Sequence, residues 1–222
     1  MPKVTANGIT MHYEQQGAGE PLILIPYLAA DHACYAFQVP EYARHFTTIS
    51  VNLRGTGESD KPSGAYTTEL LGDDVAGLMQ AMGIAKAHVA GLSLGGAVGM
   101  WLAVKHPDKV ASLSVHSGWT RSDRYLQTVV ESWQIVAGAV GVPEMTIRAI
   151  FPWCFTPELY AERSDYIESL SAFVRSRPPQ SVPDFLQQAG AVLAHDVEAH
   201  LGRIVAPTLI TCLLYTSPSP RD

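Results

Sequence analysis

The 222-residue sequence lacks several features that would place it in other classes of protein. Its three cysteines, Cys34, Cys154 and Cys212, are odd in number and no pair has metal-ligand spacing, which argues against a disulfide scaffold or a zinc site. No stretch approaches the roughly 18 apolar residues of a membrane span. The N-terminus has no apolar signal-type run. We therefore expect a cytoplasmic protein with no metal and no cofactor.

Positive charge is scarce. Lys and Arg total 15 against 21 Asp and Glu, so the net charge is -6. A mildly acidic surface argues against nucleic acid or an anionic membrane as the partner. Hydrophobic residues make up 47% of the chain, which is the ordinary globular level and enough for a sizeable core. The partner we expect is a small molecule, and the oligomeric state stays open.

Short apolar runs between turn residues predict buried strands. Four runs share this pattern: 22–25, 48–53, 87–90 and 110–115. The dipeptide Asn7-Gly8 predicts a tight hairpin before them. Apolar residues at helical spacing fill the gaps over 68–82 and 94–105. This alternation predicts an α/β fold, with a mostly parallel sheet and helices on both faces.

The alternation breaks after Val115. Residues 119–203 show helical periodicity and no clear strand, and a strand-like run resumes at 204–211. We predict that 1–118 form the first part of the core, that 119–203 form a helical cap, and that 204–211 form the seventh core strand.

The last eleven residues, 212–222, resemble one translated reading frame of a transposase adapter used to prepare sequencing libraries. A natural terminus rich in proline and serine is the alternative. We interpret 212–222 as an artefactual tail and leave it out of the fold prediction. The natural sequence then ends near Thr211, in the middle of a strand-to-loop transition.

A nucleophile motif stands at 91–95, which read Gly-Leu-Ser-Leu-Gly between a predicted strand and a predicted helix. In that context the G-x-S-x-G pattern indicates a nucleophile elbow, a sharp turn that lifts a serine above the sheet. It predicts Ser93 as the nucleophile and the backbone N–H of Leu94 as one donor to the oxyanion. A glycine-rich turn with an incidental serine is the alternative.

With these motifs the sequence resembles the α/β-hydrolase superfamily, in particular the branch of 3-oxoadipate enol-lactonases and related esterases. The stretches that carry the resemblance are Asn7-Gly8 with 12–14, 54–62, the serine elbow, 205–210 and, more loosely, 151–157. The resemblance implies an acid after the seventh strand and a histidine after the eighth. Because the seventh strand ends near Thr211, the resemblance implies that the last strand and helix of the fold are missing and that the triad Asp and His are absent from this chain.

Two positions depart from the family pattern. The loop after the third strand usually carries glycine, where this chain has Pro26-Tyr27. Alignment gives the second oxyanion N–H to Leu28, in a loop that the Cβ of Tyr27 restricts. Asn52 stands where Asp is common before the Arg54 loop, and we interpret Arg54 as a loop anchor.

Several side chains are candidates for the substrate pocket: Tyr27, His116, Trp119, Trp133 and Trp153. His116 ends the sixth strand on the active-site side of the sheet, which gives it the best claim. The tryptophans have a simpler alternative role in the cap core. We interpret the other histidines considered, His88, His106, His195 and His200, as wall or surface residues.

The leading functional prediction is a serine hydrolase that cleaves a small carboxylic ester or lactone through an acyl-enzyme at Ser93. Without its triad partners the fragment itself is expected to be inactive. Carbon–carbon hydrolysis and perhydrolysis use the same serine and stay open. A second class is a non-catalytic small-molecule-binding protein of the hydrolase fold, because fold does not dictate function.

Overall fold

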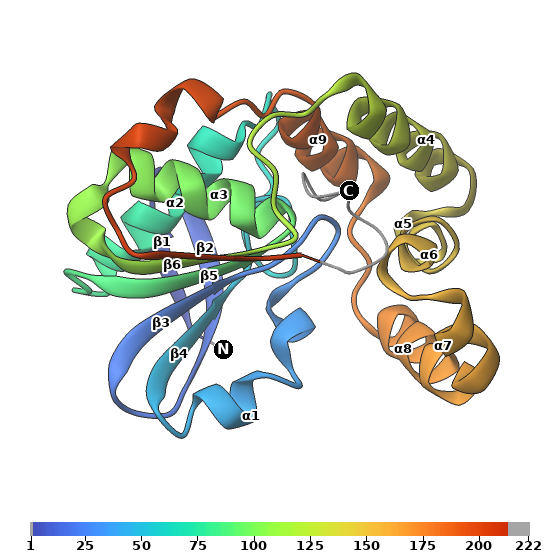
Figure 1. The fold of residues 1–222 in the computed structure, drawn as a ribbon, viewed down its shortest axis with the longest axis horizontal. Coiled ribbons are helices and arrows are strands. Elements are labelled where there is room, and N and C mark those ends of the chain that lie inside the picture. Colours follow the sequence, from blue (N-terminus) through green and yellow to red (C-terminus); the bar gives the residue numbers. More distant parts are fainter. Residues whose placement is uncertain (1, 213–222) are drawn as a thin grey trace.

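The computed structural model describes residues 2–212 (Figure 1). One sheet in the order β1-β2-β4-β3-β5-β6-β7 forms its centre. The strands are β1 Lys3–Ala6, β2 Ile9–Gln16, β3 Glu20–Ile25, β4 Phe46–Val51, β5 Ala87–Leu92, β6 Val110–His116 and β7 Thr208–Thr211. Pairing is antiparallel from β1 to β4 through β2 and parallel in the rest of the sheet. The predicted mostly parallel α/β sheet is confirmed.

Helices cover both faces of this sheet. Helices α2 (Thr68–Ala81) and α3 (Leu94–Lys105) pack over the face whose core includes Ile23, Ile49 and Val89. The opposite face packs against the short helices η1 (His32–Tyr35) and α1 (Val39–Tyr42). Thr67 has an extended backbone and is the N-cap of α2. Its hydroxyl accepts the N–H of Leu70 at 3.0 Å, which fixes where that helix begins.

Between β6 and β7 the chain is helical, and in Figure 1 these helices stand to one side of the sheet. They are α4 Arg124–Val140, α5 Val142–Met145, the π-helical turn η3 Thr146–Ile150, α6 Phe151–Cys154, α7 Pro157–Glu162, α8 Ser164–Ser176 and α9 Val182–Leu193. We call this group, α4 to α9, the cap helices. The domain limits predicted at 118/119 and 203/204 stay predictions.

Besides η1, two further 3-10 turns belong to the core side. Pro107–Lys109 (η2) follows α3 after His106. Glu198–Arg203 (η4) follows the cap helices and packs on α3, where the ring of His200 lies 5.3 Å from that of Trp101. The chain has therefore returned to the core before β7 begins.

The seventh strand is shorter than the expected 204–211. Strand β7 starts at Thr208, which pairs with Leu113 of β6. Pro207 directly before it has no backbone N–H for a ladder. The predicted artefactual tail, 212–222, lies outside the described residues, apart from Cys212. The predicted absence of a last strand and helix also concerns chain outside the described residues. Within 2–212, no helix is both long and apolar enough to cross a membrane.

His195 joins the end of the cap helices to the core. Its Nδ1 lies 2.8 Å from the Thr68 hydroxyl and its Nε2 lies 3.1 Å from the carbonyl oxygen of Trp119. Burial lowers the pKa of this imidazole below the ordinary 6.5. Burial also lowers the pKa of His12 in β2, and the neighbouring His32 adds to the shift.

These two histidines predict a loss of stability in mild acid. Below about pH 6.5 the unfolded chain binds protons that the native chain does not, so the free energy of unfolding falls as the pH drops towards the native pKa values. Each group contributes at most about 1.4 kcal/mol per pH unit. Urea denaturation between about pH 7 and about pH 5 measures the slope. His195→Gln should make the free energy of unfolding fall less steeply with pH, and His45→Gln, at an exposed site, should not. Equal slopes in these two variants would contradict the assignment of the loss to the buried histidines.

Candidate active site

Ser93 lies at the sharp turn between β5 and α3 that the motif predicts. Its φ of 54° and ψ of -116° fall outside the regions that non-glycine residues favour, at a cost of about 1–3 kcal/mol. Neighbouring backbone holds this conformation. The N–H of Ser93 donates to the carbonyl of His116 at 2.8 Å, and the Ser93 carbonyl accepts from Gly96 at 2.8 Å. The strain is therefore built into the junction of β5, β6 and α3.

Two glycines of the motif allow this junction. A Cβ on Gly91 would lie 2.1 Å from the carbonyl oxygen of Gly95. A Cβ on Gly95 would lie 2.1 Å from the carbonyl oxygen of Ile25 and 2.9 Å from that of Pro26. Strand β5, the start of α3 and the end of β3 thus meet at backbone contact, which only glycine permits. This contact places the loop after β3 beside the elbow.

That loop carries the second predicted oxyanion donor. Ile25 pairs with Gly91 in parallel register, so the residues that follow both strands emerge at the same end of the sheet. The loop turns tightly, with Ala29 at a φ of 65° and the N–H of Ala30 donating to the carbonyl of Tyr27 at 3.2 Å. Among residues 2–212, the backbone N–H groups of Leu28 and Leu94 donate to no acceptor. A donor to an oxyanion must be unused in this way, and the role of both groups stays a prediction.

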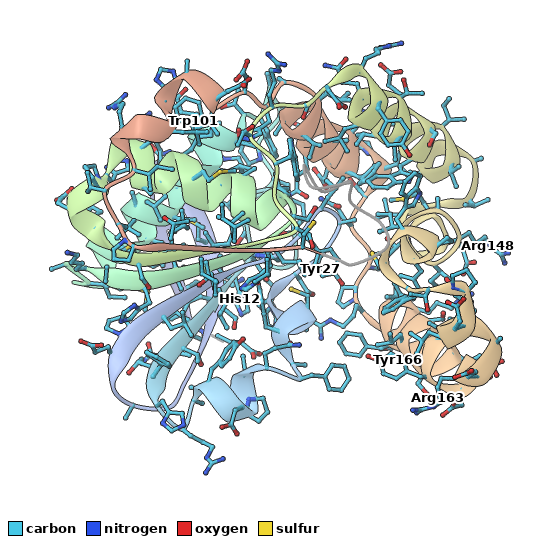
Figure 2. All side chains as sticks on the ribbon, viewed as in Figure 1. His12, Tyr27, Trp101, Arg148, Arg163 and Tyr166 are labelled. Atoms are coloured by element: carbon cyan, nitrogen blue, oxygen red, sulfur yellow. The ribbon has the colours of Figure 1, made fainter. Side chains whose placement is uncertain are left out.

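Among the pocket candidates, Tyr27 lies in different surroundings from the tryptophans. Figure 2 shows Tyr27 between the sheet and the cap helices. Burial, with the nearby Cys34 adding to it, raises the pKa of the Tyr27 phenol well above its ordinary range, so it stays a neutral hydroxyl. The indole N–H groups of Trp119 and Trp133 bond Ser122 Oγ at 2.9 Å and the Ala149 carbonyl at 3.1 Å.

Trp153 differs from the other two tryptophans. It is 36% exposed, and its ring packs edge-on against Tyr125, with 6.1 Å between ring centroids. All three indoles are therefore engaged with other residues near or within the cap helices. Their contact with a substrate stays a prediction.

Of the histidines, His116 lies nearest the elbow. It ends β6 opposite Leu92, and its carbonyl accepts the N–H of Ser93. Its Nδ1 lies 2.6 Å from the hydroxyl of Thr211, and burial lowers the pKa of the ring. His88 sits at the opposite end of β5, between Ser112 and Glu20. Among residues 2–212, no side chain hydrogen-bonds the Ser93 hydroxyl. The expected absence of the triad Asp and His from this chain stays a prediction.

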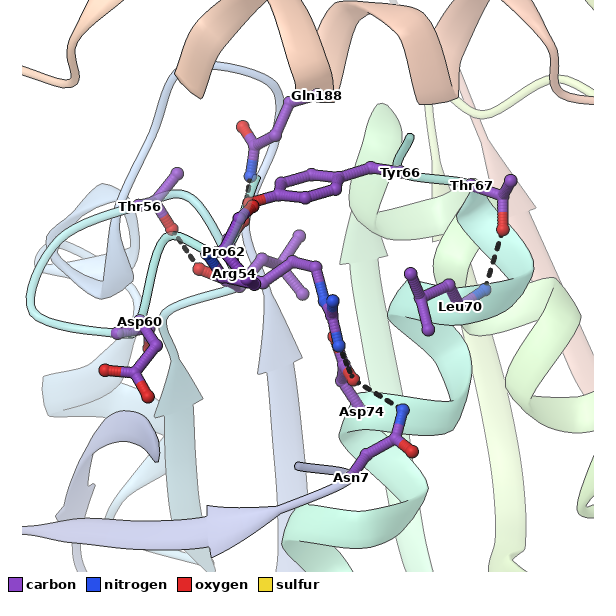
Figure 3. A network of polar contacts seen from close by, with 12 residues as sticks. Asn7, Arg54, Thr56, Asp60, Pro62, Tyr66, Thr67, Leu70, Asp74 and Gln188 are labelled. Atoms are coloured by element: carbon purple, nitrogen blue, oxygen red, sulfur yellow. Dashed lines mark hydrogen bonds and ion pairs between the residues drawn. The ribbon is translucent and has the colours of Figure 1, made fainter. Parts of the chain in front are cut away.

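The Arg54 loop is anchored by a carboxylate that the sequence analysis did not single out. Arg54 Nε and Nη2 bond the two oxygens of Asp74 at 2.6 and 2.7 Å, and Asn7 adds a bond of 2.7 Å to the same carboxylate (Figure 3). The hydrogen bonds to Asp74 raise the pKa of Arg54. The interpretation of Arg54 as a loop anchor is confirmed. The signal for Asp74 was its place on the apolar face of α2, between Leu71 and Leu78.

Comparison with known proteins agrees with this architecture. The family model for the alpha/beta hydrolase fold matches residues 20–155. A protein of Azorhizobium caulinodans named RutD, by name a carbamate hydrolase, is 30% identical over 210 residues, covering 95% of this chain and 78% of that relative. The 3-oxoadipate enol-lactonase 2 of Acinetobacter baylyi is 26% identical, covering 93% and 76%.

A solved structure gives the same result. The enol-lactonase from Burkholderia xenovorans superposes with a TM-score of 0.82 at 26% sequence identity, over 94% of this chain and 80% of that one. The family model spans more than half of the chain, and these matches are hydrolases by name. The chain therefore belongs to the α/β-hydrolase fold family, as an enzyme related to its enol-lactonases.

Proposed function

We propose that this enzyme cleaves a small carboxylic ester or lactone through an acyl-enzyme on Ser93. The observation that carries the proposal is the elbow itself: a strained serine at a strand-to-helix turn, with the N–H of Leu94 next to it and that of Leu28 in the adjoining loop, neither of them donating to another described residue. The kinship with enol-lactonases supports a lactone or ester as substrate. A cytoplasmic location stays a prediction.

The chemistry follows from these groups. Ser93 Oγ attacks the carbonyl carbon while a base takes its proton, and the carbonyl oxygen becomes an oxyanion held by the N–H groups of Leu28 and Leu94. Collapse breaks the bond to the alcohol oxygen, which leaves protonated, or stays tethered if the substrate is a lactone. Water then attacks the acyl-enzyme in the same way and releases the acid and Ser93.

The base and its acid partner are, in this proposal, residues that follow Thr211 in the parent protein. The 222-residue chain alone then retains only the contribution of the oxyanion hole and binding, roughly 10³–10⁴-fold over water. Assay of this chain on p-nitrophenyl acetate, beside a version extended with the natural C-terminus, tests the point. Comparable turnover by both would overturn it and make His116 the first candidate base.

A fluorophosphonate probe tests the nucleophile. The phosphorus reacts only with a base-activated hydroxyl, so the extended protein should be labelled on the peptide that contains Ser93. Labelling should disappear in Ser93→Ala and persist in Ser117→Ala, a second positive-φ serine, at the end of β6. A labelled Ser93→Ala protein would place the nucleophile elsewhere.

A small carbamate is the second candidate substrate. The relative at 30% identity is by name a carbamate hydrolase, and a carbamate carbonyl would meet the same serine and the same two N–H groups. Parallel assays on an enol-lactone and on a carbamate decide between them through the ratio of kcat/KM values.

A further inference from the structure

One ion pair joins the cap helices to the loop after β3. Arg177, directly after α8, places its Nη2 at 2.7 Å and its Nε at 3.2 Å from Asp31 Oδ2. The two side chains are 35% and 13% exposed. Such charge-assisted contacts hold a geometry well when they are partly shielded from water, as this carboxylate is.

Asp31 is the far anchor of the loop that carries Leu28. Its other oxygen, Oδ1, accepts the N–H of Ala33 at 2.9 Å, and its carbonyl accepts the N–H of Cys34 at 3.1 Å, so it fixes the start of η1. At its near end the loop leaves β3 beside the elbow. Residues 26–31, which we call the oxyanion loop, are therefore held by the sheet on one side and by Asp31 on the other.

The other arginines of this region do not make such a contact. Arg148 and Arg175 pair with Glu144 inside the cap helices, and Arg163 pairs with its neighbour Asp165. Two glutamines of the cap side bond a different loop, the one that begins at Arg54. Gln180 Nε2 donates to the Gly55 carbonyl at 2.8 Å and Gln188 Nε2 donates to the Arg54 carbonyl at 2.9 Å. Among the described ion pairs, only that of Arg177 ends on the oxyanion loop.

We propose that Arg177 is a positioning residue: through Asp31 it fixes the oxyanion loop, so that the Leu28 N–H reaches its place only while the cap helices are seated on the core. The role rests on the proposed function, because it assumes that Leu28 serves the oxyanion. A displacement of about 1 Å in a catalytic group can cost 10²-fold in rate. Complete loss of one oxyanion donor costs roughly 10²–10³-fold in kcat.

The test compares Arg177→Gln with Arg175→Gln in the full-length, C-terminally extended protein. Arg175 is a matched control, since its Nε lies 2.6 Å from Glu144 in a pair confined to the cap helices. Arg177→Gln should lower kcat for p-nitrophenyl acetate by roughly 10–100-fold with little change in KM, because a transition-state contact is lost. Arg175→Gln should leave both constants unchanged.

Two further measurements separate positioning from folding. Amide hydrogen exchange in the oxyanion loop should speed up in Arg177→Gln and not in Arg175→Gln. Arg177→Lys, which keeps the charge and one bond to Asp31, should recover part of kcat. Asp31→Asn should resemble Arg177→Gln, and the double variant should be no worse than either single variant.

The outcomes are decisive. Unchanged exchange in the oxyanion loop would overturn the proposal, as would faster exchange with an unchanged kcat. A raised KM with an unchanged kcat would also overturn it, since the pair would then only close the cap over the substrate. Failure of the proposed function would show separately, as fluorophosphonate labelling that survives in Ser93→Ala.

Discussion

Replacing Ser93 with alanine is expected to lower kcat of the extended protein on p-nitrophenyl acetate by roughly a millionfold. The substitution removes the proposed attacking oxygen and leaves the proposed oxyanion donors of Leu28 and Leu94 in place. The free energy of unfolding should change little, because alanine has the same backbone strain at a φ of 54° as serine.

Ser117→Ala is the matched control for this experiment. Ser117 also has a positive φ, of 49°, and its N–H donates to the carbonyl of Thr211 at 2.7 Å, at the same end of the sheet. Its kcat should stay within about threefold of the parent value, which corresponds to less than about 1 kcal/mol. A loss of similar size in both variants would mean that the sheet end, and not the Ser93 hydroxyl, had been disturbed.

Replacing Asp74 with alanine is expected to destabilise the fold by about 3–5 kcal/mol. Arg54, a residue that is 8% exposed, would lose its counter-ion and both of its bonds to that carboxylate, and Asn7 would lose its acceptor. Gln188 also bonds the Arg54 backbone, so the loop and α9 would loosen together. The urea midpoint at an unchanged m value measures the loss.

The neighbouring carboxylate is the control. Asp73 is 30% exposed and pairs with Lys105 and His106 on the outer side of α2. Asp73→Ala should cost about 1 kcal/mol or less, because exposed ion pairs contribute little. Equal losses from Asp73→Ala and Asp74→Ala would contradict the assignment of Asp74 as the anchor of the Arg54 loop.

Local patterns in the sequence predicted the elements around the elbow closely. The helix expected over 94–105 is observed over the same residues, and that over 68–82 ends one residue earlier. Both rest on the spacing of apolar side chains and on capping or stop residues, which act over a few positions. Strand limits were less accurate, as for β7, because they depend on where the neighbouring strand offers partners.

Contacts between distant parts of the chain could not be predicted in this way. The pair of Arg177 with Asp31 spans 146 positions, and nothing in the spacing of either residue indicates the other. Asn52 shows the same limit. Its Oδ1 accepts the backbone N–H of His32 at 2.7 Å, and its Nδ2 lies 2.9 Å from His12 Nδ1, so the amide bridges two buried histidines. The sequence shows only that asparagine stands at position 52, where the family commonly has aspartate.

The acyl-enzyme itself gives the most direct test of the central claim. The extended protein would be mixed with p-nitrophenyl acetate, quenched in acid during the first turnover, digested and analysed by mass spectrometry. We predict an added acetyl group on the peptide that contains Ser93, absent when Ser93 is alanine. An acetyl group on another residue, or steady turnover with no acetylated peptide under conditions where deacylation limits the rate, would contradict the account.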